Sequence, residues 1–434
     1  MPALAPTIIL GLGVTGLSCV RFLRAQGQAV AVWDTRPHPP GAEILAHEFT
    51  EVPLLTGALD GVQLSQAETL VVSPGIALAT PAIAMAMQAG VEVIGDIELF
   101  ARHVDAPVVA ITGSNGKSTV TTMVGQMAAA AGWSVGVGGN IGVPALDLLG
   151  QGHDLYVLEL SSFQLETTHS LNAAVATVLN VSADHLDRYP DFEAYRQAKL
   201  KLYQQAQQTL ENLDDPLTYG QASATLGFTV GCPNTSEYGI ADGALCRGTE
   251  PIIALAQLPL VGRHNYANAL AAVALAEAVQ IPRGACVQAL QHFNSLPHRC
   301  QWVATKAGVR YVNDSKATNV GATMAALAGL ADEAANLWLI AGGDAKGADL
   351  SELTPLLAEL AGVITLGQDG PAIADLVPNS HAVNTLEQAV QWAASQAKSG
   401  DLVLLSPACA SLDMFRSFEH RGVDFMSAVE ALPC

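Results

Sequence analysis

The stretch Val108-Val-Ala-Ile-Thr-Gly-Ser-Asn-Gly-Lys-Ser-Thr-Val120 decides the fold of the central part of this chain. Its first four residues are apolar and three of them are β-branched, which predicts a buried strand. A glycine-bearing turn from Thr112 to Thr119 follows, and a helical pattern then continues to Gly132. A strand, a turn and a helix start bring free backbone N–H groups and the helix dipole together, which predicts a phosphate-binding cradle.

The residue types in this turn suit a phosphorylated nucleotide. Lys117 offers a positive charge for the outer phosphates, and Ser118 or Thr119 offers a hydroxyl for Mg²⁺. Ile111 stands where the longer Gly-x-x-x-x-Gly-Lys-Ser/Thr motif has its first glycine, and the simpler alternative is a turn before an ordinary capped helix. Lys-Ser-Thr directly after Gly-Ser-Asn-Gly favours the phosphate site. The candidate nucleotide-binding residues here are Gly113, Ser114, Asn115, Gly116, Lys117, Ser118 and Thr119.

Length and composition favour a protein of several domains. The chain has 434 residues, of which 50% are hydrophobic and 14% charged, enough apolar material for more than one buried core. A formal net charge of −20 argues against a nucleic-acid or anionic-membrane surface. The seven cysteines are scattered, no signal-peptide pattern begins the chain, and no apolar run reaches the length of a membrane span. We therefore expect a cytoplasmic protein without membrane insertion or nucleic-acid binding.

The first part of the chain carries a second glycine-rich turn. A short strand, Thr7–Leu10, leads into Gly11-Leu-Gly-Val-Thr-Gly16, and the next strand ends at Asp34. A Gly-x-Gly-x-x-Gly turn followed about 20 residues later by an acid is typical of dinucleotide-binding folds, where the acid binds a ribose. Taken alone, this pattern suggests NAD and a dehydrogenase, although the same turn suits any phosphorylated nucleotide. Arg36 adds a cation for a phosphate or a uracil-side group.

Polar side chains also follow the later strands. Glu159 lies in an otherwise apolar segment, and a buried carboxylate needs a cation or strong hydrogen-bond donors to stay ionised, of which Mg²⁺ is the simplest here. His185 alone would be a hydrogen-bonded structural histidine, but its place in Asp184-His-Leu-Asp187 favours a metal or phosphate site. By spacing alone, Lys199 is an ordinary solvated lysine in a helix expected from Phe192 to Gln208.

These segments predict three α/β domains that share one ligand site. Boundaries are expected near residues 93–96 and 294–297, which divides the chain into residues 1–94, 95–296 and 297–434. Strands in the last part again end in polar turns, such as the one that contains Asp314 and Lys316. Ligands of open α/β sheets bind at the carboxyl ends of the strands. We therefore expect the ligands to be gathered between the domains.

Together these motifs resemble the Mur ligase family from Gly11 to Gly422, with the weakest match around residues 205–258. The segments that carry the resemblance are Gly11-Leu-Gly-Val-Thr-Gly16, Thr112-Gly-Ser-Asn-Gly-Lys-Ser-Thr119, Leu158-Glu-Leu-Ser-Ser-Phe-Gln-Leu-Glu166, Asp184-His-Leu-Asp-Arg-Tyr189, His264-Asn-Tyr-Ala-Asn-Ala269, Asn313-Asp-Ser-Lys-Ala-Thr-Asn319 and Ser406-Pro-Ala-Cys-Ala-Ser-Leu-Asp413. The resemblance implies a Rossmann-like UDP-binding N-terminal domain, a central P-loop ATPase-type domain with a mostly parallel sheet, and a Rossmann-like C-terminal domain that binds an amino acid.

The resemblance also implies which residues bind each ligand. The UDP-linked substrate would contact Val14, Thr15, Asp34, Thr35, Arg36, Ser73, Gly75, Asn140, Ser161 and His185. ATP would contact the phosphate turn together with Asn268, Arg299 and Asp314. The amino acid, D-glutamate in the branch that this chain resembles, would contact Lys316, Thr318, Lys346, Ser411, Leu412 and Phe418. Mg²⁺, two ions on the family pattern, would be held by Ser118, Thr119, Glu159 and His185, with Lys199 joining them once CO₂ has converted it to a carbamate.

The resemblance implies an enzyme that uses ATP to join D-glutamate to UDP-N-acetylmuramoyl-L-alanine through an acyl phosphate and a tetrahedral intermediate. Lys117, Glu159, His185 and Lys199 would be its catalytic residues. That activity would place a monomeric enzyme in peptidoglycan synthesis and cell-wall biogenesis, and so in cell shape, cell division and the cell cycle. Related ligases that add diaminopimelate carry an Asp-Asn-Pro-Arg segment, which this sequence lacks. The alternatives are a Mur-type or folylpolyglutamate-type ligase for another amino acid, a nucleotide-dependent regulator, or the dehydrogenase.

Overall fold

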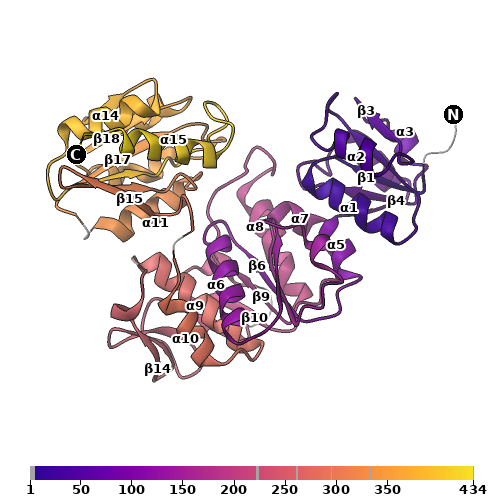
Figure 1. Ribbon diagram of the computed structural model, residues 1–434, viewed down its shortest axis with the longest axis horizontal. Helices are drawn as coiled ribbons and strands as arrows, with labels where there is room; N and C mark the ends of the chain where they lie inside the picture. The colour runs from indigo at the N-terminus through magenta and orange to yellow at the C-terminus, as the bar shows by residue number, and fades with distance from the viewer. Residues whose placement is uncertain (1–4, 221–223, 261, 295, 332–333, 434) are drawn as a thin grey trace.

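The structure, a computed structural model, describes residues 5–220, 224–260, 262–294, 296–331 and 334–433. Over these residues the chain forms three α/β domains, each built on its own largely parallel sheet, with the central domain between the other two (Figure 1). The start of the chain, for which the sequence predicts no signal peptide, includes residues 1–4, and these and Cys434 lie outside the described part. No helix in the described part is long and apolar enough to cross a membrane.

The first domain has a parallel sheet in the order β3-β2-β1-β4-β5. Its strands are β1 (Thr7–Leu10), β2 (Val30–Asp34), β3 (Leu54–Thr56), β4 (Thr69–Val72) and β5 (Glu92–Ile94). Its helices are α1 (Val14–Ala25), α2 (Ala42–Glu48), α3 (Gly61–Leu64) and α4 (Pro81–Gln88). The strand order reverses between β1 and β4, where ligands of such sheets bind, and the turn after β1 leaves the sheet there. A Cβ on Gly16 would lie 2.0 Å from the Gly11 carbonyl oxygen, so this close turn requires glycine.

The central domain contains the phosphate turn. In the part of it that the structure describes, one sheet has the order β14-β13-β12-β11-β10-β9-β6-β8-β7, parallel from β7 to β12 and antiparallel beyond. The strands are β6 (Val108–Thr112), β7 (Val135–Gly139), β8 (Leu155–Glu159), β9 (Val175–Val178), β10 (Thr209–Asn212), β11 (Leu226–Phe228), β12 (Tyr238–Ala241), β13 (Ala244–Arg247) and β14 (Glu250–Ala254). The helices are α5 (Asp96–Ala101), α6 (Lys117–Ala130), α7 (Ser162–Glu166), α8 (Phe192–Leu200), α9 (Arg263–Ala278) and α10 (Arg283–Gln291).

The helix expected from Phe192 to Gln208 is shorter in the structure. It ends at Leu200, a tighter 3₁₀ turn covers Lys201–Gln205, and β10 begins at Thr209. Tyr203 lies in that turn, and its hydroxyl accepts from the N–H of Val178 and donates to the carbonyl of Leu210, at 3.1 and 3.0 Å. The prediction was wrong because these contacts turn the chain back into the sheet, which local helix propensity cannot foresee.

The third domain has the sheet order β15-β16-β20-β17-β18-β19, in which only the pair β15–β16 is antiparallel among the described strands. The strands are β15 (Gln301–Lys306), β16 (Val309–Asn313), β17 (Leu337–Gly342), β18 (Gly362–Leu366), β19 (Ser380–Ala382) and β20 (Leu402–Leu405). The helices are α11 (Val320–Leu330), α12 (Thr354–Leu357), α13 (Gly370–Ala374), α14 (Leu386–Gln396) and α15 (Phe418–Glu430). Helix α11 lies on the side of this domain that faces the central domain (Figure 1).

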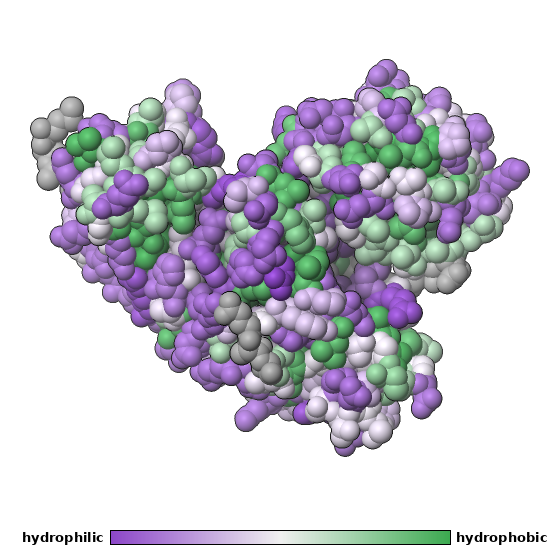
Figure 2. Space-filling view, turned by 180° about the vertical axis from the view of Figure 1, so that it is seen from behind, coloured by the Kyte–Doolittle hydropathy of each residue, from purple (hydrophilic) through white to green (hydrophobic). Residues whose placement is uncertain are grey.

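The first and central domains share an apolar core. Leu17 and Leu23 of α1 belong to one cluster with Leu146, Leu158 and Leu160 of the central domain. The third domain has its own clusters and is separated from the first by a notch above the central domain (Figure 2). Burial of apolar area therefore joins the first two domains, while the third is joined to the central domain by the mainly polar contacts described below.

Candidate active site

The turn after β6 is shaped to hold a phosphate group. Gly116 has a φ of +83°, and a Cβ there would lie 2.4 Å from Oδ1 of Asn268, so glycine is required. No side chain caps the N-terminus of α6, which leaves its first N–H groups and the positive end of its dipole for a ligand. The ammonium of Lys117 lies over the turn and donates to the carbonyls of Gly113 and Ser114, at 2.9 and 3.0 Å.

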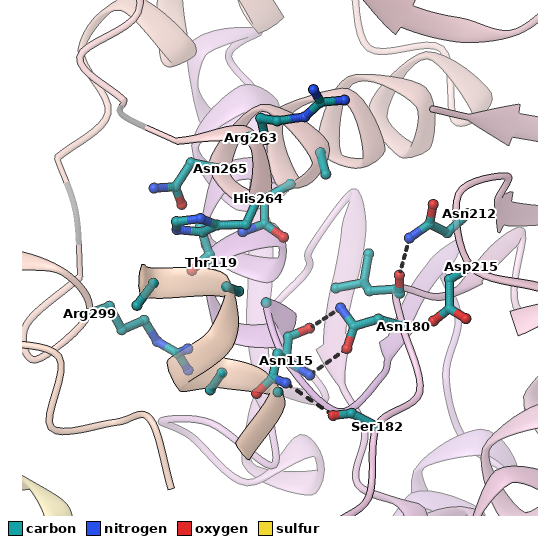
Figure 3. Close-up of a pocket in the computed structure, with 18 of the residues that line it drawn as sticks. Asn115, Thr119, Asn180, Ser182, Asn212, Asp215, Arg263, His264, Asn265 and Arg299 are labelled. Atoms are coloured by element: carbon teal, nitrogen blue, oxygen red, sulfur yellow. Dashed lines mark hydrogen bonds between the residues drawn. The ribbon is translucent and has the colours of Figure 1, made fainter. Parts of the chain in front are cut away.

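Residues that follow β9 fix this turn from the side. Oδ1 of Asn180 accepts from the N–H of Asn115 at 2.8 Å, and its Nδ2 donates to the carbonyl of Asn115 at 3.0 Å (Figure 3). The hydroxyl of Ser114 donates to the carbonyl of Ser182 at 3.0 Å and lies 3.1 Å from the hydroxyl of Tyr195. These bonds use the N–H groups of Ser114 and Asn115 and fix the shape of the turn, so the first N–H groups of α6 are held in place before a ligand arrives, as electrostatic stabilisation of a reaction requires.

A cavity of about 400 Å³ lies on one side of the turn, between the central and third domains (Figure 3). The predicted ATP-binding residues Asn268, Arg299 and Asp314 all line it. Arg299 reaches from the third domain to the phosphate turn, where its guanidinium donates to the hydroxyl of Ser118 at 2.7 Å. Burial raises the pKa of Asp314 to about 6. The size and mixed lining of this cavity suit a nucleoside.

A second cavity, of about 280 Å³, also borders the phosphate turn and shares Asn115, Gly116, Arg299 and Lys316 with the first. It brings together residues that the sequence assigned to different ligands, from the central and the third domain. The predicted site residues that line it, besides the phosphate turn and Arg299, are Asn140, Glu159, Ser161, His185, Lys199, Lys316, Thr318 and Lys346. The residues predicted to bind phosphate, metal and amino acid thus surround one space.

Glu159 and His185 fit the predicted role in binding Mg²⁺. The side chain of Glu159 is buried, and its Oε1 accepts from Nδ2 of Asn140 at 2.7 Å, while its Oε2 has no partner among the described residues. Burial lowers the pKa of His185, which favours the neutral imidazole that a metal needs. The described residues contain no cluster of three or more His, Cys, Asp or Glu arranged for a metal. Mg²⁺ commonly takes one or two protein ligands and completes its shell with water and phosphate, so the lining of this cavity is compatible with the predicted ion.

Lys199 is buried, so the expectation of a solvated helix lysine was wrong. Only 2% of the residue is exposed, and its Nζ donates to the carbonyl of Gly113 at 3.0 Å. The ammonium also lies 4.5 Å from the ring centroid of Tyr195. Burial, with the nearby charge of Lys117, lowers the pKa of Lys199 well below its usual value. This environment favours an uncharged amine beside the phosphate turn.

Three of the six predicted amino-acid-binding residues line the second cavity. They are Lys316, Thr318 and Lys346, and Nζ of Lys346 is paired with the carboxylate of Asp184 in the central domain. Burial alone would raise the pKa of Asp184. The ammonium of Lys346 and the other groups that contact this carboxylate have the larger effect, so the pKa of Asp184 is lowered. Burial also lowers the pKa of Lys316, to about 8. The third domain thus presents two amines to the centre of the site.

The other three residues of that set do not line either cavity. Phe418 lies next to Lys316, whose ammonium is 3.9 Å from its ring centroid. Ser411 is buried, whereas Leu412 is 74% exposed. Among these three residues, Phe418 is the one that reaches the cavity through another predicted residue, Lys316, in the described part of the chain.

The predicted residues of the first domain lie apart from both cavities. Asp34 is buried and accepts from the N–H of Leu12 at 2.8 Å, and its ion pair with Arg36, at 2.6 Å, is the main cause of a pKa of about 2. This carboxylate thus holds the glycine turn, which argues against its use on the ribose of NAD. Of the other predicted residues, Val14, Thr35, Arg36 and Gly75 are exposed, and Thr15 and Ser73 are half-buried.

Comparisons with known proteins cover the whole chain. The N-terminal domain of MurD-like Mur ligases matches residues 5–95, the Mur ligase middle domain residues 111–276, and the glutamate ligase domain of Mur ligases residues 298–409. The UDP-N-acetylmuramoylalanine–D-glutamate ligase of Shewanella violacea is 53% identical over 98% of this chain and 96% of its own length. The chain belongs to the Mur ligase family. The enzyme of the same name from Nitrosococcus oceani is 51% identical over 99% of this chain and 98% of its own.

Solved structures agree with the three-domain Mur ligase fold. A pseudomurein peptide ligase type C from Methanothermus fervidus has a TM-score of 0.64 at 18% identity, covering 98% of this chain and 99% of that one. The UDP-N-acetylmuramate–alanine ligase of Thermotoga maritima has a TM-score of 0.62 at 16% identity, with the same coverage. At these identities the similarity concerns the fold. The predicted fold class, three α/β domains, is thereby confirmed.

Two residues of this Mur ligase that sequence reasoning did not single out make contacts between domains. Arg188 donates to the carbonyls of Pro74 and Ile76 in the first domain, at 3.3 and 2.9 Å. Asn319 bonds to Asn115 and Asp184 from the third domain. Both lie inside segments that carried the family resemblance, and that position was the one signal for them in the sequence.

Proposed function

We propose that this Mur ligase joins D-glutamate to UDP-N-acetylmuramoyl-L-alanine at the expense of ATP, in peptidoglycan precursor synthesis. The observation that carries the proposal is the second cavity, where Lys117 on the phosphate turn, the carboxylate of Glu159 and the amines of Lys316 and Lys346 surround one space. Curated relatives that are 51–53% identical to this chain bear the name of that reaction, which supports the choice of substrates.

The reaction takes two steps because a carboxylate is a poor electrophile at neutral pH. An oxygen of the L-alanyl carboxylate attacks the γ-phosphorus, the bond to ADP breaks, and an acyl phosphate forms. The amine of D-glutamate then attacks the acyl carbon and loses a proton, and the tetrahedral intermediate expels phosphate as the amide forms. Lys117 would stabilise the charge that develops on the transferring oxygens. Lys346 and Thr318 would bind the side-chain carboxylate of D-glutamate. The ammonium of Lys346, which is paired with Asp184, would then either leave that carboxylate or contact both.

Mg²⁺, for which we propose two sites, would neutralise phosphate oxygens and polarise the phosphorus. Glu159, His185 and the hydroxyls of Ser118 and Thr119 would hold it. The hydrogen bond from Asn140 fixes one oxygen of Glu159 and leaves the other without a protein partner among the described residues. The orientation of this ligand is therefore set by the chain itself.

We further propose that Lys199 reacts with CO₂, forming an N–C bond and releasing one proton. The neutral amine is the nucleophile in this step, and the lowered pKa of Lys199 favours it. The carbamate would replace a positive charge beside Lys117 by a negative one. Enzyme equilibrated with ¹³C-bicarbonate should show a carbamate signal by NMR that Lys199→Arg lacks and that Lys201→Arg, at an exposed position, retains. A signal that persists in Lys199→Arg would contradict this assignment.

Arg188 should set the affinity for the UDP-linked substrate, because it holds the turn after β4 in the first domain. Arg188→Ala is expected to raise KM for that substrate about tenfold, from the loss of two hydrogen bonds to a charged group, and to leave KM for ATP within about twofold. Arg196→Ala is the matched control, since Arg196 also donates to two carbonyls, of Leu217 and Tyr219, but within the central domain. Equal effects of the two variants on KM would contradict the prediction.

The function is tested by phosphate release from ATP and Mg²⁺ with UDP-N-acetylmuramoyl-L-alanine and each of several amino acids. Release that requires both that substrate and D-glutamate, with a product heavier by one glutamyl unit, is the expected result. Release with another amino acid would overturn the proposed substrate. Slow release that depends on neither compound would favour the nucleotide-dependent regulator.

We also propose the domain limits 1–94, 95–296 and 297–434, and a cytoplasmic monomer that acts on small molecules. The limits are supported by the sheets, because β5 ends at Ile94 and β15 begins at Gln301. Sedimentation equilibrium of the full chain tests the monomer, since a dimer would double the mass.

A further inference from the structure

Asn319 lies where the amino-acid-binding turn of the third domain meets the central domain. It follows Lys316 and Thr318 in the turn after β16, and it is the N-cap of α11. Only 5% of the residue is exposed. The side chain of an N-cap asparagine normally forms hydrogen bonds with the first turn of its own helix and with water. Here the rest of the side chain is turned to another domain.

The carboxamide of Asn319 uses its full hydrogen-bonding capacity. Its Oδ1 accepts from the N–H of Ala322 at 2.9 Å and from Nδ2 of Asn115 at 3.2 Å. Its Nδ2 donates to Oδ1 of Asn115 at 3.2 Å and to Oδ2 of Asp184 at 3.3 Å. The helix N–H needs an acceptor and the carboxylate needs a donor, so these two partners fix which way the amide points.

This one side chain therefore joins three loops of the site. Asn115 belongs to the phosphate turn, and Asp184 precedes His185 and is also paired with Lys346. The start of α11 also packs closely against the segment after β9, since a Cβ on Gly321 would lie 2.8 Å from Oγ of Ser182. The third domain thus contacts the phosphate turn through a pair of amides that bond to each other, the buried one of Asn319 and the half-buried one of Asn115.

We propose that Asn319 is a positioning residue that couples nucleotide binding at the phosphate turn to ordering of the amino-acid-binding turn. The inference rests on the proposed function and adds to it the link between two of its ligands. The backbone of Asn115 is already fixed by Asn180, so a bound nucleotide would act on the side chain of Asn115 and strengthen the amide pair. The pair in turn holds the turn that contains Lys316 and Thr318. Because such coupling is reciprocal, an occupied amino-acid site also favours nucleotide binding.

Asn319→Ser separates this role from helix capping. Serine is a good N-cap, so α11 and the melting temperature should be preserved, but its short side chain cannot reach Asn115 and Asp184. We expect KM for D-glutamate to rise about tenfold, and KM for UDP-N-acetylmuramoyl-L-alanine to stay within about twofold. Asn319→Asp also caps the helix but places a second carboxylate against Asp184, so KM for D-glutamate should rise further than in the serine variant.

Thr385→Ala is the control for a general weakening of the third domain. Thr385 caps α14 by accepting from the N–H of Gln388, and α14 lies on the side of the domain away from the central one (Figure 1). This variant should lower the melting temperature and leave KM for D-glutamate unchanged. A rise in KM as large as that of Asn319→Ser, or an unchanged KM in Asn319→Ser, would overturn the inference.

Hydrogen–deuterium exchange gives a readout that does not require turnover. A non-hydrolysable ATP analogue with Mg²⁺ should protect residues 315–323 in the wild type and not in Asn319→Ser. Equal protection in both proteins, or none in the wild type, would overturn the coupling. Protection in the wild type alone, without any turnover that depends on D-glutamate, would support the coupling and reject the proposed function instead.

Discussion

Replacing Lys117 by methionine is expected to lower kcat for phosphate release about a thousandfold while the protein stays folded. The ammonium of Lys117 lies over the phosphate turn, bonded to the carbonyls of Gly113 and Ser114, so it is placed to meet the oxygens of the transferring phosphate. Methionine keeps most of the apolar stem but not the charge. Burial lowers the pKa of Lys117, because the charged ammonium is less favourable there than in water. Replacing Lys117 by a neutral side chain should therefore not lower the melting temperature.

The measurement is steady-state phosphate release with both substrates present, together with a thermal melt of each protein. Lys201→Met serves as the control, because Lys201 is an exposed lysine two residues beyond Lys199 and should tolerate the change. Near-normal turnover in a correctly folded Lys117→Met would remove Lys117 from the chemistry.

The sequence predicted the strands well where a strand is apolar on both faces. β6 and β1 are such strands, and their expected and observed limits agree to within a residue. A parallel sheet that is covered on both faces has strands that are apolar throughout. Such a run of β-branched residues, ended by a glycine turn, can be recognised from the local sequence alone. The polar turns at the carboxyl ends of the central strands could be predicted to converge because these ends meet at one edge of the sheet, whereas the turns of the first domain lie apart from both cavities.

Lys199 shows where local patterns are insufficient. Its helix spacing is that of a solvated lysine, yet it lies under the phosphate turn with its Nζ on the carbonyl of Gly113, 86 positions earlier in the chain. Only tertiary packing of α8 against the turn buries it, and periodicity carries no information about that neighbour. The family resemblance placed Lys199 in the site, but its burial and its lowered pKa came from the structure.

Contacts between domains could not be predicted from local sequence at all. Asn319 is a reasonable N-cap when only its own helix is considered, and Arg188 is a reasonable surface arginine. Their partners Asn115 and Pro74 lie 204 and 114 positions away, on other domains. The same limit explains why the first-domain residues were assigned to a substrate without any indication that Asp34 is used internally to hold its own glycine turn.

Glu159→Gln is expected to lower activity without lowering stability. Glutamine has the same shape, and its carbonyl oxygen can keep the 2.7 Å hydrogen bond from Asn140. Its amide would then replace the buried Oε2, which has no partner among the described residues. Because an unpartnered buried carboxylate oxygen is costly, the melting temperature should stay the same or rise.

Activity should fall in this variant because Mg²⁺ loses an anionic ligand. We expect kcat to fall about a hundredfold and the Mg²⁺ concentration for half-maximal rate to rise, which a titration of Mg²⁺ at saturating ATP measures. Glu211→Gln is the matched control, since Glu211 is also a buried carboxylate of the central domain but accepts from the N–H of Gly220, and its Mg²⁺ titration should be unchanged. If Glu159→Gln instead lost stability and kept its Mg²⁺ dependence, Glu159 would be a structural residue and the metal would have to bind elsewhere in the cavity.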